Sequence, residues 1–187
     1  KLCVEIDADA RATLRSNRPE WKLLEPGDVH ALPPEAIVEA SGLRRLEAAL
    51  VSGGPPCQPF SKASYWVNGD SGRLSDPRSR TLTAFLSVVD AALPQVILLE
   101  NVRGLEFRGK REGIDLLLRG IEEINQRHGT TYDPVVLRLQ AADFGVPQLR
   151  ERTYLVAERD GRRFTPPQPT CAANSRVTAW EAIGHLD

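Results

Sequence analysis

A helix followed at once by a buried strand constrains the fold of this 187-residue chain more than any other feature. Residues 81–93 carry apolar side chains at the spacing of one helical face, and residues 95–99 form a nearly continuous apolar run. Such a run is typical of a parallel strand that is covered on both faces. Glu100 and Asn101 follow at the carboxyl end of this strand. The pattern predicts an α/β protein that binds ligands beyond its strand ends.

The rest of the chain repeats the alternation of strands and helices. The expected elements are strand 1–6, helix 8–16, helix 37–50, strand 49–52, helix 112–128, strands 135–140 and 153–157, a proline-rich exit at 164–169 and helix 177–186. This order predicts a doubly wound, mostly parallel sheet.

Composition favours one soluble intracellular domain. Hydrophobic residues make up 41% and charged residues 26% of the chain, and no apolar run approaches the roughly 20 residues that span a bilayer. The net charge is −1, so a nucleic-acid role must rest on local chemistry. Cys3, Cys57 and Cys171 are odd in number and form no C-x-x-C pair. Neither a disulfide framework nor a zinc site is therefore predicted.

One cysteine stands between prolines in the segment Gly-Gly-Pro-Pro-Cys-Gln-Pro-Phe-Ser over 53–61. An isolated cysteine is usually a small buried core residue. Here the segment follows a buried strand, and its stiff composition favours an exposed thiol. A junction from strand to loop to helix supplies the environment that lowers a thiol pKa. Cys57 is therefore a candidate nucleophile.

Two more polar groups lie at strand ends. Taken alone, Glu100 is better explained as a helix cap or a solvated acid than as a functional acid. Gln148, Arg150 and Arg152 alternate just before the strand at 153–157, so in an extended segment they would share one face. Taken alone, they are also compatible with a solvated strand edge.

Together, the Pro-Cys loop, the Glu-Asn-Val strand end and the Gln-x-Arg-x-Arg segment resemble the cytosine-C5 DNA methyltransferase family, in the family's order and over residues 5–184. The resemblance implies a Rossmann-like, S-adenosylmethionine-dependent methyltransferase fold with an antiparallel C-terminal strand. It implies that Cys57 attacks C6 of a flipped-out cytosine, and that Glu100 and Arg152 stabilise the ring. The implied supporting residues, with Asn101 bracing the backbone of the Cys57 loop, are Pro56, Asn101, Gln148 and Arg150.

The resemblance also implies a binding site for the methyl donor, whose product is S-adenosylhomocysteine, and no metal. Glu5 would accept hydrogen bonds from the ribose hydroxyls, and Ile6 would contact adenine. Asp28 and Val29 would bind the adenine edge, although Asp28 by itself is compatible with an ordinary turn residue. The remaining implied cofactor-binding residues are Pro55 and Leu82.

The ends of the chain depart from the family pattern. The family's glycine-rich first cofactor loop and its central strand would precede Lys1, so we expect a gap in the sheet. Residues 1–163 would form an incomplete catalytic domain, and residues 164–187 an exit segment towards an absent target recognition domain. The missing parts would come from the same chain or from a second chain.

The implied activity is cytosine C5 methylation of double-stranded DNA. The expected setting is a bacterial restriction-modification system with an endonuclease as functional partner, in the cytoplasm at the nucleoid and away from membranes. Three alternatives stay open: an RNA-directed relative, a non-catalytic interaction or DNA-binding module with relic motifs, and a redox or hydrolytic enzyme that uses Cys57 with His30 or His128. The intact Cys57, Glu100 and Arg152 argue against a relic.

Overall fold

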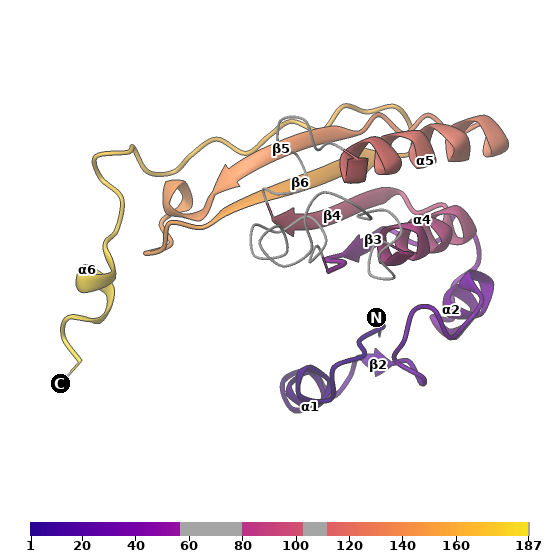
Figure 1. Cartoon of the computed structure of the whole chain (residues 1–187), viewed down its shortest axis with the longest axis horizontal. Helices are drawn as coiled ribbons and strands as arrows, with labels where there is room; N and C mark the ends of the chain where they lie inside the picture. Colours follow the sequence, from indigo (N-terminus) through magenta and orange to yellow (C-terminus); the bar gives the residue numbers. More distant parts are fainter. Residues whose placement is uncertain (57–79, 103–111, 187) are drawn as a thin grey trace.

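A computed structural model describes residues 1–56, 80–102 and 112–186 (Figure 1). The elements are β1 (Leu2–Cys3), α1 (Ala8–Asn17), β2 (Lys22–Leu23), α2 (Pro34–Ala40), β3 (Leu50–Gly53), α4 (Arg80–Ala92), β4 (Val96–Val102), α5 (Glu112–His128), β5 (Val135–Gln140), the 3-10 helix η4 (Ala141–Phe144), β6 (Glu151–Glu158) and α6 (Ala179–Ile183). Within these ranges, no helix has both the length and the apolar character of a membrane span.

Four of the strands form one sheet in the order β3-β4-β6-β5. β3 and β4 run parallel, whereas β6 runs antiparallel to both of its neighbours, β4 and β5. In the register, Leu99 lies opposite both Gly53 of β3 and Leu155 of β6. The predicted α/β sheet with an antiparallel C-terminal strand is confirmed.

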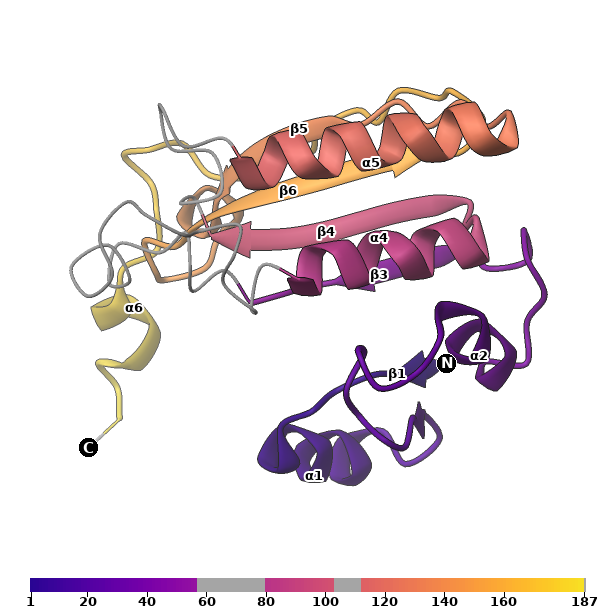
Figure 2. The same ribbon diagram turned by 45° about the vertical axis from the view of Figure 1, so that its right-hand side comes forward.

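β1 and β2 form a separate parallel pair, with Leu2 opposite Lys22 and Cys3 opposite Leu23. In the described part of the chain this pair is not hydrogen-bonded to the four-stranded sheet. It lies with α1 beside α2, below the larger sheet as seen in Figure 2. The gap expected in the sheet is therefore present as a break between two sheets.

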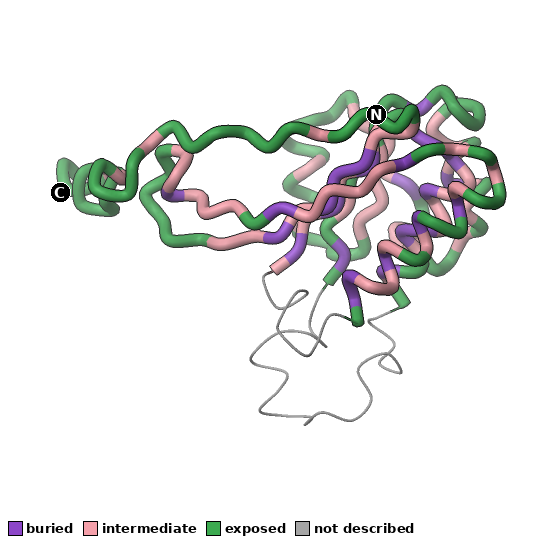
Figure 3. The backbone as a smooth tube through the Cα atoms, turned by 90° about the horizontal axis from the view of Figure 1, so that it is seen from above, coloured by how far each residue is buried: buried purple, intermediate pink, exposed green. Residues whose placement is uncertain are grey.

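The core lies between one face of the larger sheet and helices α4 and α5, which cover β3–β4 and β5–β6 respectively (Figure 2). Burial alternates along β4, because successive side chains point to opposite faces. Ile97 and Leu99 are fully buried and pack with Val89, Leu117 and the other apolar residues of the two helices. Each such side chain contributes about 1.5–3 kcal/mol to stability by leaving water. Figure 3 shows these buried residues concentrated where helices and sheet meet.

The prediction of one helix over 37–50 was wrong. α2 ends at Ala40, and Gly42 adopts a positive φ of 77°, which favours glycine at a helix end. Leu46 also has a positive φ, 73°, and its amide donates to the carbonyl of Ala92. Leu43 and Leu46 remain 41% and 53% exposed. The helical spacing of the leucines therefore does not form a buried face.

The segment after β6 leaves the body of the molecule and ends in α6, apart from the rest of the fold (Figures 1 and 3). Its contact with η4 is polar: the carbonyl of Asp143 accepts from the amides of Thr170 and Cys171 at 2.9 and 3.0 Å. The Asp143 carboxylate also pairs with Arg176. α6 begins with a capping box formed by Thr178 and Glu181 and has no buried residue. Residues 170–176 of the segment are thus held against η4 by hydrogen bonds and an ion pair.

We expect different responses to substitution at Gly53, the last residue of β3, and at Gly54, which follows the strand. A Cβ built at Gly53 would lie 2.7 Å from Phe85 Cδ2, whereas one at Gly54 would approach nothing closer than Glu100 Oε2, at 3.5 Å. We expect Gly53→Ala to lower the free energy of unfolding by about 1–3 kcal/mol, because the buried ring must shift. Gly54→Ala, the matched control, should change it by less than about 0.5 kcal/mol. Urea denaturation measures both, and equal losses would contradict the packing assigned to Gly53.

The burial of Tyr132 leads us to expect that the free energy of unfolding falls at alkaline pH. Its side chain is 3% exposed, and its hydroxyl donates to the carbonyl of Pro94. Burial raises the pKa of Tyr132 well above its ordinary value. The stabilisation that comes from the raised pKa is fully present below the unfolded-state pKa of about 10. It is lost as the pH rises from that value through the folded-state pKa.

We therefore expect wild-type protein to lose more stability than Tyr132→Phe between about pH 8 and about pH 11. At about pH 8 the variant should be less stable by about 1 kcal/mol, since it lacks the hydrogen bond. Urea denaturation at both pH values measures the difference. Parallel losses in the two proteins would show that Tyr132 does not carry the effect.

Candidate active site

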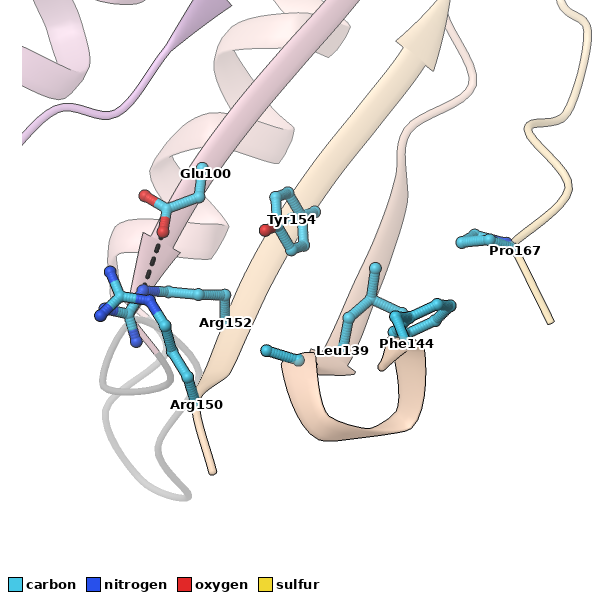
Figure 4. A pocket seen from close by; sticks show the side chains of 8 residues that line it. Glu100, Leu139, Phe144, Arg150, Arg152, Tyr154 and Pro167 are labelled. Carbon is cyan, nitrogen blue, oxygen red and sulfur yellow. Dashed lines mark ion pairs between the residues drawn. The ribbon is translucent and has the colours of Figure 1, made fainter. Parts of the chain in front are cut away.

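The ends of two neighbouring strands bring a carboxylate and a guanidinium together. Glu100 lies near the carboxyl end of β4, and Arg152 near the start of the antiparallel β6, where it pairs with Val102. Arg152 Nε lies 2.8 Å from Glu100 Oε1, and Arg152 Nη1 donates to the carbonyl of Glu151 at 2.8 Å. Figure 4 shows the two side chains pointing toward each other. The guanidinium plane is thus held by two contacts.

This ion pair borders a pocket of about 330 Å³. The charged groups of Glu100, Arg150 and Arg152 lie at one side of it, and an apolar and aromatic wall lies at the other (Figure 4). The lining residues are Glu100, Leu139, Ala141, Phe144, Arg150, Arg152, Tyr154 and Pro167. A small pocket with a few convergent polar groups on an apolar wall suits a flat heterocycle with a hydrogen-bonding edge.

Asn101 connects β4 to the loop that follows β3. Its side chain is 3% exposed, and its Nδ2 donates to the carbonyl of Pro55 at 3.1 Å. Pro55 is buried and Pro56 is exposed. The expected brace on the loop backbone is present as this hydrogen bond, and its importance for catalysis stays a prediction. Cys57, the expected nucleophile, lies outside the described residues.

The Gln-x-Arg-x-Arg segment is brought only partly to the pocket. Gln148 and Arg150 are exposed and precede β6, which begins at Glu151. The amide of Arg150 donates to the side chain of Gln140, and the Arg150 side chain lines the pocket beside Arg152 (Figure 4). Gln148 lies in a bend and is not one of the lining residues.

Five of the six residues expected at the methyl donor lie around β1, β2 and the start of α4, and the sixth, Pro55, follows β3. Glu5 Oε1 accepts from the amide of Asp7 at 2.8 Å, and Asp28 Oδ1 accepts from the amide of His30 at 2.9 Å. Ile6 is 70% exposed, so an apolar surface stands next to Glu5. Two carboxylates with an exposed apolar side chain between them in sequence fit the hydroxyls and ring of a nucleoside.

The other two donor candidates differ in burial. Val29 is half-buried beside Asp28 in the loop after β2. His30 Nε2 in that loop lies 3.4 Å from Thr81 Oγ1 of α4, which brings the loop next to Leu82. Leu82 itself is only 2% exposed and packs in the hydrophobic core. Its role at the donor stays a prediction.

The structure adds residues that the sequence did not single out. Tyr154, Phe144 and Pro167 line the pocket, and Arg11 is a buried charge at the expected donor site. Tyr154 was detectable, because it continues the alternation of Arg150 and Arg152. Phe144, Pro167 and Arg11 depend on contacts between distant segments, so no local pattern indicated them.

Comparison with solved structures assigns the fold. The chain superposes over its full length on a DNA modification methyltransferase encoded within an E. coli prophage, with a TM-score of 0.75 and 23% identity, and covers 48% of that protein. Over 91% of its length it matches a mutant of Spodoptera frugiperda DNMT2, with a TM-score of 0.62 and 23% identity. The fold is therefore the α/β fold of DNA methyltransferases.

Sequence comparison gives the family. Residues 2–185 match the family model for C-5 cytosine-specific DNA methylase. The chain is 35% identical to the type II methyltransferase M.SacI of Streptomyces achromogenes over 93% of its length, and 36% identical to M.AquIA of Picosynechococcus over 98%. The chain belongs to the C-5 cytosine-specific DNA methylase family. It spans 43% of the length of M.SacI and 72% of that of M.AquIA.

Two asparagines make the Asn101 brace testable. Asn101 donates to the carbonyl of Pro55. Asn125, which is not one of the pocket-lining residues, donates to the carbonyl of Tyr132 at 2.9 Å and also accepts from Thr130 Oγ1 and from the amide of Tyr132. We expect Asn101→Ala to lower the free energy of unfolding by about 1–3 kcal/mol, because it leaves the enclosed carbonyl of Pro55 unpaired, and Asn125→Ala to lower it by at least as much, because it removes three hydrogen bonds. Urea denaturation measures the losses. An unchanged Asn101→Ala protein would refute the brace.

Proposed function

We propose that the protein containing this chain transfers a methyl group from S-adenosylmethionine to C5 of cytosine in double-stranded DNA. The observation that carries the proposal is the Glu100–Arg152 pair at the pocket, because it joins the carboxyl end of β4 to β6 beside the loop that leads to Cys57. The pocket is of a size for one base, so the target cytosine must leave the duplex to enter it.

In the proposed reaction, the Cys57 thiolate forms a bond to C6, and the electron pair of the C5–C6 bond makes C5 nucleophilic. Glu100 hydrogen-bonds the ring at N3, and Arg152 hydrogen-bonds O2, so both act where negative charge develops. S-adenosylmethionine supplies an electrophilic methyl group. After methylation, C5 loses its proton to a base and the Cys57–C6 bond breaks, which restores the thiolate. Pro56, Asn101, Gln148 and Arg150 are proposed to position the loop and the substrate.

The proposed donor site consists of Glu5, Ile6, Asp28, Val29, Pro55 and Leu82. Glu5 and Asp28 are suited to accept from the ribose hydroxyls and the adenine amine, and exposed Ile6 is suited to contact the ring. No metal takes part in the proposed reaction, and its second product is S-adenosylhomocysteine.

The type II relatives support a restriction-modification role. We propose a bacterial enzyme that acts at the nucleoid in the cytoplasm, with a restriction endonuclease as its functional partner. Residues 1–163 are assigned to the catalytic domain and residues 164–187 to the exit towards a target recognition domain. The break between the β1–β2 pair and β3 supports a further strand between the two sheets, from the same chain or a second one.

Covalent trapping tests the proposal. The protein as its gene encodes it is incubated with S-adenosylmethionine and duplex DNA that contains 5-fluorocytosine, which cannot lose a proton from C5. We expect a denaturation-resistant adduct that Cys57→Ser abolishes. Asn101→Ala should slow its formation by about tenfold or more, whereas Asn125→Ala, which should be at least as destabilised, should not. The same assay on residues 1–187 alone tests whether further segments are needed.

Three outcomes would contradict the proposal. Trapping on RNA and not on DNA would identify an RNA-directed relative. No adduct on duplexes that together contain every short cytosine context would favour a non-catalytic module. An adduct retained in Cys57→Ser would assign the nucleophile to another residue.

A further inference from the structure

Arg11 is a buried charge beside the proposed donor site. It lies in α1 and is only 7% exposed, and arginine is one of the charged residue types that are almost never fully buried unless they are paired. Its Nη1 donates to two backbone carbonyls, that of Glu5 at 2.7 Å and that of Leu24 at 3.1 Å. Its Nη2 pairs with the Glu25 carboxylate. These three partners lie in two loops, one after β1 and one after β2.

These two loops follow β1 and β2, and they carry four of the six donor candidates, namely Glu5, Ile6, Asp28 and Val29. Glu5 supplies both the carbonyl that Arg11 binds and the carboxylate proposed for the ribose. Leu24 precedes Asp28 by four residues in the second loop. β1 and β2 are each only two residues long, so the strand pairing alone gives the loops little support.

Gly27 shows how closely these parts are packed. A Cβ at Gly27 would lie 2.0 Å from the carbonyl oxygen of Glu5 and 2.3 Å from Arg11 Nη1. The loop after β2 therefore lies directly against the Arg11 guanidinium and against the backbone of the loop after β1. Three segments, α1 and the two loops, meet at one side chain.

We propose that Arg11 is a positioning residue that fixes the separation of Glu5 and Asp28, and thereby the affinity for the adenosine part of the methyl donor. This inference rests on the proposed function, because it assumes that the two carboxylates bind a nucleoside. Arg11 acts through the two carbonyls, and it touches neither the reacting carbon nor the transferred methyl group.

Arginine is suited to this role because its planar fork donates in several fixed directions at once. A lysine at position 11 would keep the charge and would lose the fixed geometry. Arg15 offers a matched control. It lies one turn further along α1, and its side chain is 60% exposed. It shares the Glu25 carboxylate at 3.0 Å, and among the described residues the carbonyls of Glu5 and Leu24 accept from Arg11 and not from Arg15.

The test measures S-adenosylhomocysteine binding by calorimetry to the protein as its gene encodes it, with Arg11→Lys and Arg15→Lys. We expect Arg11→Lys to weaken binding by about tenfold or more, and Arg15→Lys to change it by less than about twofold. In methylation assays, Arg11→Lys should raise the KM for S-adenosylmethionine and leave kcat at saturating donor within about twofold. A role confined to general stability would not produce this separation.

A double-mutant cycle tests the route through Glu5. If Arg11 acts by placing Glu5, then Arg11→Lys should weaken binding much less in a Glu5→Gln background than in the wild type. Thermal unfolding is recorded for every variant, and Arg11→Gln replaces Arg11→Lys should the lysine variant not fold.

Three results would overturn the inference: unchanged donor affinity in Arg11→Lys, an equal loss in Arg15→Lys, or full additivity with Glu5→Gln. Failure of the wild-type protein to bind S-adenosylhomocysteine would instead refute the proposed function, and the inference with it. The wild-type measurement therefore separates the two cases.

Discussion

The pairing of β4 with a neighbour on each side is the interaction on which the rest of the structure depends. Parallel pairing with β3 places the loop that leads to Cys57 next to the carboxyl end of β4. Antiparallel pairing with β6 brings the start of that strand to the same end. Pro55, Glu100 and Arg152 lie about 40 to 50 residues apart from one to the next in the chain, and the register of β3, β4 and β6 brings them to one end of the sheet. A shift of one residue would turn each side chain to the opposite face.

The alternation of side chains along β4 divides two roles between adjacent residues. Asn101 points to the helix-covered side, where it is buried and holds the carbonyl of Pro55. Glu100 points to the other side, where it is more exposed and borders the pocket. A buried amide is well suited to fixing a loop, because both its donor and its acceptor need partners. A carboxylate at the pocket edge remains accessible to a ligand. The dipeptide therefore joins support and chemistry at one strand end.

Sequence patterns predicted the elements whose periodicity reflects burial. α4, α5 and β5 lie within a residue or two of their expected limits, because their apolar faces pack against one another in the core. The leucines at 43–50 had helical spacing without a surface to cover, and the positive φ angles of Gly42 and Leu46 prevent a helix there. Arg11 was missed for a different reason. Two of its three partners are backbone carbonyls in the loops after β1 and β2, which any residue possesses, so only the folded chain identifies them.

The site is better explained by preorganisation than by stability. The side chains of Arg152 and Glu100 are 20% and 40% exposed, and an ion pair so open to solvent contributes little, less than about 1 kcal/mol. Its value lies in geometry, since contacts to Glu100 and to the Glu151 carbonyl orient the guanidinium before a ligand arrives. Arg11 extends the same principle to the proposed donor site, where a buried guanidinium fixes loops that short strands hold weakly. In both places an arginine fixes the backbone or side chain beside an acid: Glu100 on β4, and Glu5 in the loop that follows β1.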